Sequence, residues 1–205
     1  MVPAAQLYTP MTTNAISRCQ RLGAPVKLEA ELRTEIMHWR FIDTWSGCVP
    51  WRTEDHRVVR TLASDASQSR WGATLTLPEG LVKTGDYFSQ QLGDRDIDIK
   101  EAYALLYALQ AFSSHLENTR VDALVDNKVL YHAWLRQGCR NQGVNQALKS
   151  IFDTTLRYNM ALSIQWIPSA FNPADQPSRE WSDADAQLAQ PLWERIEELL
   201  SLIHI

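Results

Sequence analysis

The chain has 205 residues, of which 45% are hydrophobic and 21% charged, and its 20 basic and 24 acidic side chains give a formal net charge of −4. This composition excludes an intrinsically disordered chain and a strongly basic nucleic-acid coat, and it supplies enough apolar residues for one globular domain with an appendage. No apolar stretch approaches the roughly 18 residues that a membrane-spanning helix needs, and the first twenty residues lack the apolar segment of a secretory signal. We therefore expect a soluble intracellular protein that does not bind a membrane.

Residues 1–57 predict an irregular lead-in followed by one helix. Residues 1–26 contain three prolines and no sustained hydrophobic period, which is typical of irregular structure. From Leu28 to Trp45, apolar residues recur at spacings of three and four, which indicates a helix with one apolar face. We interpret this helix as an element that connects to, and packs against, the domain that follows.

Residues 58–180 predict a single α/β domain. Strand-like patterns occur three times in succession, at 58–67, 71–77 and 82–90, and predict an antiparallel meander. After the meander come helical patterns at 100–116, 128–138 and 144–159. Strand-like patterns occur between and after them, at 120–127 and 160–168. This order predicts a mixed five-stranded sheet, in which a three-strand antiparallel meander joins parallel strands and helices flank the sheet. Residues 181–205 predict a C-terminal helical extension.

Four acidic residues stand where predicted elements begin or end. Asp65 and Asp126 end the first and fourth strands, Glu101 begins the first long helix, and Asp175 follows the last strand. Each one alone is more simply explained as a turn or cap residue, so the prediction rests on their combined order. If the first and fourth strands are neighbours, the four carboxylates come close together, and their mutual repulsion then shifts their pKa values or recruits cations.

A cluster of carboxylates suits magnesium, which prefers hard oxygen ligands and keeps water or phosphate oxygens in its remaining positions. Two such ions roughly 3.5–4 Å apart can activate a water molecule, hold a scissile phosphate and stabilise the leaving oxygen. We therefore predict a site for two magnesium ions, formed by Asp65, Glu101, Asp126 and Asp175.

Four sequence strings surround these acids, and they extend over about residues 58 to 180. They are ASDASQSRWGA around Asp65, IDIKEAYALLYAL around Glu101, LVDNKV around Asp126 and WIPSAFNPADQPSR around Asp175. In this order they resemble the ribonuclease H domain of retroelement reverse transcriptases, and most closely that of DIRS-like or gypsy-like elements. Weaker matches on either side resemble the segments that flank this domain in such polyproteins.

The resemblance implies a ribonuclease H-like fold and endonucleolytic cleavage of the RNA strand of RNA–DNA hybrids with two magnesium ions, or with manganese. It implies that Asp65 bridges both ions, while Asp126 and Asp175 each help to hold one. Glu101 would bind a metal and reach toward the 2′-hydroxyl group beside the scissile phosphate, the group that distinguishes RNA from DNA. The chain would then be part or a relic of a polyprotein, with an upstream reverse transcriptase domain as a partner.

The sequence departs from the family pattern in three places. Trp166 stands where many members have a histidine that is thought to assist proton transfer or product release, and Ser169 replaces a glycine in the same loop. Arg70 stands where a glycine is frequent, and the spacing from Asn172 to Asp175 is one residue short. The missing histidine favours an alternative, a catalytically silent ribonuclease H-like module with a structural or protein-binding role.

Further residues are expected to contact the substrate. Ser67, Gln68 and Asn127 neighbour the carboxylates and would donate hydrogen bonds to the nucleic-acid backbone. Arg136 and Arg140 stand near a turn rich in glycine and glutamine, where they form either a phosphate-contacting ridge or an ordinary solvated helical hairpin. The eight tryptophans are expected mainly in the core, with Trp166 and Trp181 as possible stacking platforms beside the site.

Other enzyme classes fit the sequence less well. A transposase or integrase of related fold needs its last carboxylate as a glutamate on the terminal helix, and a proofreading exonuclease needs a second acid where Ser67 stands. A Ser–His–Asp hydrolase is not indicated, because no G-x-S-x-G motif occurs. The three cysteines are far apart without a CxxC pair, which predicts reduced thiols.

Overall fold

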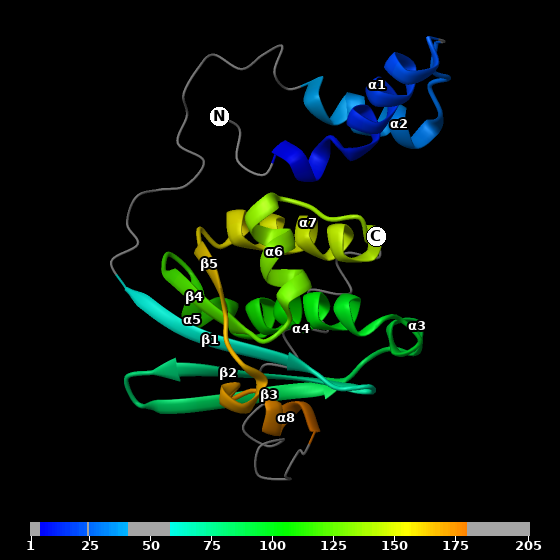
Figure 1. Ribbon diagram of the computed structural model, residues 1–205. Coiled ribbons are helices and arrows are strands. Elements are labelled where there is room, and N and C mark those ends of the chain that lie inside the picture. Colours follow the sequence, from blue (N-terminus) through cyan, green and yellow to red (C-terminus); the bar gives the residue numbers. More distant parts are fainter. Residues whose placement is uncertain (1–4, 24, 41–57, 180–205) are drawn as a thin grey trace.

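The computed structural model describes residues 5–23, 25–40 and 58–179, and a five-stranded sheet forms its centre (Figure 1). The strands are β1 (Val59–Ala66), β2 (Arg70–Leu77), β3 (Gly80–Tyr87), β4 (Arg120–Val125) and β5 (Ala161–Trp166), in the spatial order β3-β2-β1-β4-β5. The pairs β1–β2 and β2–β3 are antiparallel, whereas β1–β4 and β4–β5 are parallel. The predicted mixed sheet, with its antiparallel meander and parallel strands, is confirmed.

Helices cover both faces of this sheet. They are α3 (Gln90–Gly93), α4 (Ile97–Ala111), α5 (Ser113–Leu116), α6 (Lys128–Arg136), α7 (Gln142–Arg157) and α8 (Asp175–Arg179), and the 3-10 helix η3 (Ser169–Phe171) lies between β5 and α8. Helix α4 packs against β1, β2 and α7, while α8 packs against β2 from the opposite side of the sheet (Figure 1). Within the described residues, no helix has the length and apolar character needed to cross a bilayer.

Helix α4 is the central element of the core. The face predicted from its sequence, which includes Leu105 and Leu109, is fully buried. Its alanines, among them Ala104 and Ala108, are buried as well, because the helix lies between the sheet and α7 rather than on a surface. Small side chains on the second face allow this close packing on two sides. The helix also begins earlier than predicted, at Ile97, so Glu101 lies in its second turn and does not open it.

The expectation of an irregular lead-in is wrong for part of residues 1–26. A 3-10 helix, η1 (Ala5–Tyr8), is followed by α1 (Pro10–Leu22), which begins at a proline and ends before Gly23 in a left-handed conformation. No residue of α1 is buried, so its apolar side chains do not contribute to the core. The Glu35 carboxylate instead accepts hydrogen bonds from the backbone N–H groups of Met11 and Thr12, which caps α1 from the next helix.

That next helix is α2 (Ala30–His38), which lies inside the segment predicted to be helical. The rest of that segment beyond residue 40 lies outside the described residues, as does the predicted C-terminal extension. Tyr8 links this N-terminal pair of helices to α7, because its hydroxyl donates a hydrogen bond to Asp153 Oδ1 at 2.8 Å. Its ring also stacks on the His38 ring with the centroids 4.4 Å apart.

Candidate active site

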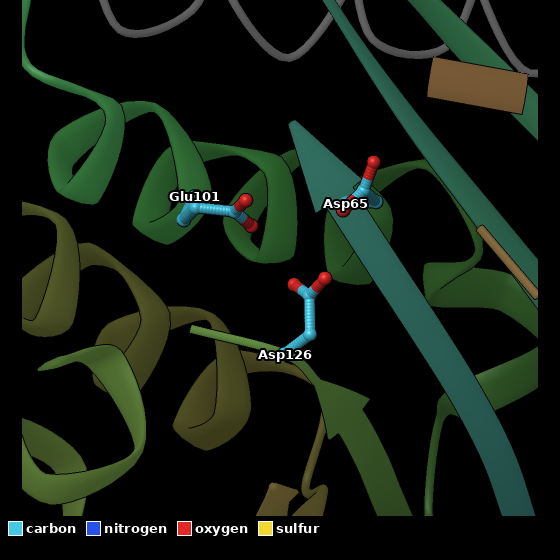
Figure 2. A group of neighbouring side chains, drawn as sticks. All are labelled: Asp65, Glu101 and Asp126. Atoms are coloured by element: carbon cyan, nitrogen blue, oxygen red, sulfur yellow. The ribbon is translucent and has the colours of Figure 1, made fainter. Parts of the chain in front are cut away.

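Three of the four predicted acids meet at one edge of the sheet. Asp65 comes from the end of β1, Asp126 directly follows β4, and Glu101 projects from α4. One carboxylate oxygen from each lies within 4.8 Å of the others, and Figure 2 shows the three carboxyl groups facing a common space. The sheet explains this meeting, since β1 and β4 are parallel neighbours and both strands end at the same edge. Their register pairs Ala63 with Leu124, and continuing it by two residues brings Asp126 beside Asp65.

Asp65 is the acid closest to the sheet interior, with only 5% of its surface exposed. Burial raises the pKa of its carboxyl group, and the negative charges of Asp126 and Asp175 raise it further. The Ser178 hydroxyl opposes this shift by donating a hydrogen bond to Asp65 Oδ2 at 2.5 Å. Asp65 is therefore held in position from α8 while its charge remains unneutralised.

Glu101 is buried to the same extent, and its Oε2 has no hydrogen-bond partner among the described residues. Burial, together with the charges of Asp65 and Asp126, raises the pKa of this carboxyl group to about 9. A backbone hydrogen bond from Ala66 favours the ionised form, but Oε2 still lacks a partner, which is costly in a buried position. A divalent cation would supply that partner, so the residues present fit a metal ion with oxygen ligands such as magnesium.

Asp175 is the predicted acid that does not join this group. It is the first residue of α8, and its Oδ1 pairs with Arg179 Nη2 at 2.7 Å, one turn along the same helix. It still lies near enough to raise the pKa of Asp65. A surface pocket of about 470 Å³ between η3 and α8 is lined in part by Asp175 and Arg179, but by none of the three converging acids.

Two polar residues that the sequence analysis did not assign a role hold α8 against the sheet. Asn172 is buried, and its Nδ2 donates a hydrogen bond to the main-chain oxygen of Ser64 at 3.0 Å, next to Asp65. Ser178 is also buried and bonds Asp65 directly. The sequence feature that could have indicated this role is their spacing, because Asn172 stands three residues before Asp175 and Ser178 three residues after it.

Glycine at two positions of the sheet makes this approach of α8 possible. Gly72 is the antiparallel partner of Asp65 in β2, and a Cβ atom there would lie 2.5 Å from the main-chain carbon of Pro177. A Cβ atom at Gly85 would lie 3.1 Å from the Pro177 main-chain oxygen. Without side chains at these positions, the backbone of α8 can come close enough for Ser178 to reach Asp65.

The residues expected to bind substrate near the acids take part in hydrogen bonds within the protein. The Ser67 hydroxyl closes the turn between β1 and β2, where it bonds the backbone of Arg70. The Gln68 main-chain oxygen accepts a hydrogen bond at 2.6 Å from Nζ of Lys100, a fully buried lysine that ties this turn to α4. The side chain of Gln68 remains exposed.

Asn127 caps α6, because its Oδ1 accepts a hydrogen bond from the backbone N–H of Leu130, and its Nδ2 donates to Asp98 of α4 at 2.9 Å. Asn127 thereby fixes the chain directly after Asp126. Arg136 and Arg140 are exposed, at the end of α6 and in the connection to α7. Substrate contacts by these residues remain a prediction.

The fold is ribonuclease H-like. The crystal structure of ribonuclease H1 from the halophilic archaeon Halobacterium salinarum matches with a TM-score of 0.51 and 18% sequence identity, over 60% of this chain and 96% of that one. The N-terminal ribonuclease H domain of a Mycobacterium tuberculosis protein matches with a TM-score of 0.51 and 15% identity, over 64% of this chain and 99% of that one. At these identities the similarity establishes the fold alone. No family model matches the sequence, and no curated protein matches it.

Proposed function

We propose that this protein is a metal-dependent endonuclease that cleaves the RNA strand of RNA–DNA hybrids. The observation that carries the proposal is the meeting of Asp65, Glu101 and Asp126, which come from three separate elements, in a ribonuclease H-like fold. The two matching proteins named above are ribonucleases H, which supports the same activity. The unpartnered Glu101 oxygen favours a bound cation over a purely structural cluster.

In the proposed reaction, bound divalent cations supply Lewis-acid chemistry that activates a water molecule and stabilises the leaving oxygen. Asp65, Glu101 and Asp126 would hold these cations, and Ser178 keeps the Asp65 carboxyl group in place by its hydrogen bond. Asn127 fixes the backbone after Asp126 by capping α6. Each acid is thus set by its own element, so the site is preorganised before the substrate binds.

The finer parts of the proposal rest on the sequence motifs. The first of these parts is a site for two magnesium or manganese ions, with Asp175 as the fourth acid. The second is an origin in a DIRS-like or gypsy-like element, with an upstream reverse transcriptase domain as a partner. Asp175 would bind a cation through Oδ2 or by releasing Arg179, since Oδ1 is paired with Arg179. The adjoining pocket leaves room for that rearrangement and for a phosphate group.

The direct test is cleavage of an end-labelled RNA–DNA hybrid by the full chain in magnesium, with the corresponding DNA duplex as the comparison. We expect cuts in the RNA strand alone, which chelation of the metal abolishes and Asp126→Asn reduces by more than about a hundredfold. Asp122→Asn is the matched control, because Asp122 lies near the start of β4 and pairs with Arg120, away from the site. A folded wild-type chain that cleaves no hybrid in magnesium or manganese would refute the proposal.

The alternative, a catalytically silent ribonuclease H-like module, is favoured by one observation. The indole Nε1 of Trp166 donates a hydrogen bond to the main-chain oxygen of Asp126 at 2.9 Å, so the position expected to carry a histidine holds a structural contact instead. A silent module would show no magnesium-dependent cleavage, and substituting its acids would change nothing but stability. The cleavage assay therefore separates the two functions.

A further inference from the structure

Trp166 and Lys128 form an aromatic and cationic pair beside the acids. Trp166 is the last residue of β5 and pairs in register with Val125, the residue before Asp126. Its indole N–H is bonded to the Asp126 main-chain oxygen, so the ring is fixed close to one of the three acids. Lys128, the first residue of α6, places its Nζ 4.7 Å from the centroid of this ring. The pair therefore lies on the β5 side of the candidate site.

Packing alone does not explain this pair. The Trp166 side chain is held by its hydrogen bond, yet 38% of the residue's surface remains exposed, unlike the fully covered residues of the core. Lys128 is exposed, and among the described residues no carboxylate forms an ion pair with it. A large apolar ring and an unpaired cation thus share one solvent-facing position at the edge of an acidic cluster.

Nucleic acid offers chemistry that matches both members of this pair. An aromatic side chain can pack against a base or sugar, and such stacking tolerates any sequence because every base has a π-face. A lysine ammonium pairs with a backbone phosphate, and the cost of bringing phosphates near carboxylates falls when a cation stands between them. A bonded indole loses little conformational freedom when a ligand packs on it, because the ring is already held.

We propose that Trp166 and Lys128 form a substrate contact for the proposed ribonuclease H activity, in which the indole packs against a nucleotide and the ammonium binds a phosphate of the strand held next to Asp126. The inference rests on the proposed function and assigns the position that lacks the family's histidine to substrate binding. Trp166 has a second role as a positioning residue, since its N–H holds the backbone at Asp126.

The test measures the dissociation constant of a fluorescent RNA–DNA hybrid over a series of salt concentrations, with Asp126→Asn in the full chain as the parent so that the hybrid stays intact. Trp166→Ala should weaken binding about tenfold. Lys128→Gln should lower the slope of log K against log salt by about 0.9, the value for one lost phosphate contact. Lys27→Gln removes the same charge from an exposed site between α1 and α2, and should leave the slope unchanged.

Trp166→Phe separates contact from positioning, because it keeps a ring and removes the indole N–H. It should bind within about threefold of the parent, and in the otherwise wild-type chain it should lower kcat while KM stays constant. Trp166→Ala removes both the ring and the N–H, so it should raise KM and lower kcat. The effects of Trp166→Ala and Lys128→Gln on binding should not add, since the two side chains touch.

Three outcomes overturn the inference. If Trp166→Ala and Lys128→Gln both leave the dissociation constant and the salt slope unchanged, the inference is refuted and the proposed function stands. Equal loss of binding in Trp166→Phe and Trp166→Ala would assign the effect to the hydrogen bond and not to the ring. A wild-type chain that neither binds nor cleaves the hybrid would remove both the proposed function and this inference.

Discussion

The two sides of the candidate site are held in different ways. On one side, Asp65 and Asp126 follow adjacent parallel strands, and Glu101 projects from the 15-residue helix α4, which is packed between the sheet and α7. On the other side, Asp175 begins the five-residue helix α8, which is fixed mainly by close backbone contact with β2 and by the hydrogen bonds of Asn172 and Ser178. The first side is set by strand register, and the second depends on a few contacts.

This difference has a chemical consequence. Three acids converge, Glu101 Oε2 has no hydrogen-bond partner among the described residues, and the pKa values of Asp65 and Glu101 are raised. Asp175 has a partner already, because Arg179 neutralises it within the same helix. The sheet side therefore lacks a countercharge that a cation would supply, whereas the charge of Asp175 is already balanced by Arg179.

Substituting one acid on each side should change the rate of hybrid cleavage by very different amounts. Asp65→Asn should reduce hybrid cleavage by more than about a hundredfold, since a bound metal contributes several kcal/mol to the transition state and Asp65 is one of the three acids that meet. Asp175→Asn should reduce cleavage by about tenfold and raise the magnesium concentration needed for half-maximal rate. Initial rates over a magnesium titration provide the measurement.

Arg179→Gln tests the same difference between the two sides, because it frees Asp175 from its ion pair and keeps all four acidic residues. This variant should need less magnesium than the wild type. Equal losses of cleavage rate in Asp65→Asn and Asp175→Asn would show that the two sides contribute equally to metal binding, contrary to the asymmetry in the structure.

The sheet side is also the part that the sequence predicts well. Asp65 and Asp126 each end a hydrophobic segment, and parallel pairing of such segments places their ends together whatever the rest of the fold does. Glu101 was placed correctly near them, although α4 begins at Ile97, three residues before the predicted start at residue 100. Local pattern sufficed here because each acid belongs to a long, regular element.

The α8 side and the N-terminal helices could not be predicted in the same way. The pairing of Asp175 with Arg179, and the hydrogen bond from Ser178 to Asp65, depend on where a five-residue helix lies, and so short a helix carries no hydrophobic period. Helix α1 was missed for a related reason. It buries no residue, and its N-terminus is capped by Glu35 from α2, a contact that the sequence of α1 does not contain.

The second prediction uses the pH dependence of stability on the sheet side. The ordinary pKa of a glutamate is 4.5, and that of Glu101 is raised to about 9 in the folded protein, so between these values the folded state binds more protons than the unfolded state. The free energy of unfolding of the metal-free protein should therefore fall as pH rises from about 4.5 to 9. Asp65 shifts in the same direction and adds to the slope.

Thermal unfolding at several pH values in the presence of a chelator measures this effect. At pH 8 to 9, Glu101→Gln should raise Tm by roughly 5–10 °C over the wild type, and the gain should disappear near pH 4. Magnesium should raise Tm of the wild type at high pH and have a smaller effect on the variant. The control is Glu117→Gln, which changes an exposed glutamate far from the acids. A flat pH profile for the wild type would contradict the raised pKa of Glu101.

A substitution at Gly72 tests whether α8 is fixed by its close approach to β2, and we expect it to have a modest effect. Gly72→Ala adds a methyl group where the Pro177 backbone lies within 2.5 Å, and backbone cannot move aside as a flexible side chain can. The substitution should cost about 1–3 kcal/mol of stability, which is typical of overpacking, and should lower Tm by a few degrees. Because α8 must shift, the Ser178 hydrogen bond to Asp65 should lengthen or break, and the pKa of Asp65 should rise further.

Gly93→Ala is the matched control for Gly72→Ala, since a Cβ atom there meets nothing within 4 Å. The two readouts are Tm and the pH at which hybrid cleavage reaches half its maximum on the acid side, which should move upward in Gly72→Ala alone. A loss of stability without that pH shift would mean that α8 tolerates displacement while Asp65 keeps its hydrogen bond. The close approach of α8 to β2 would then contribute to stability without controlling the hydrogen bond between Ser178 and Asp65.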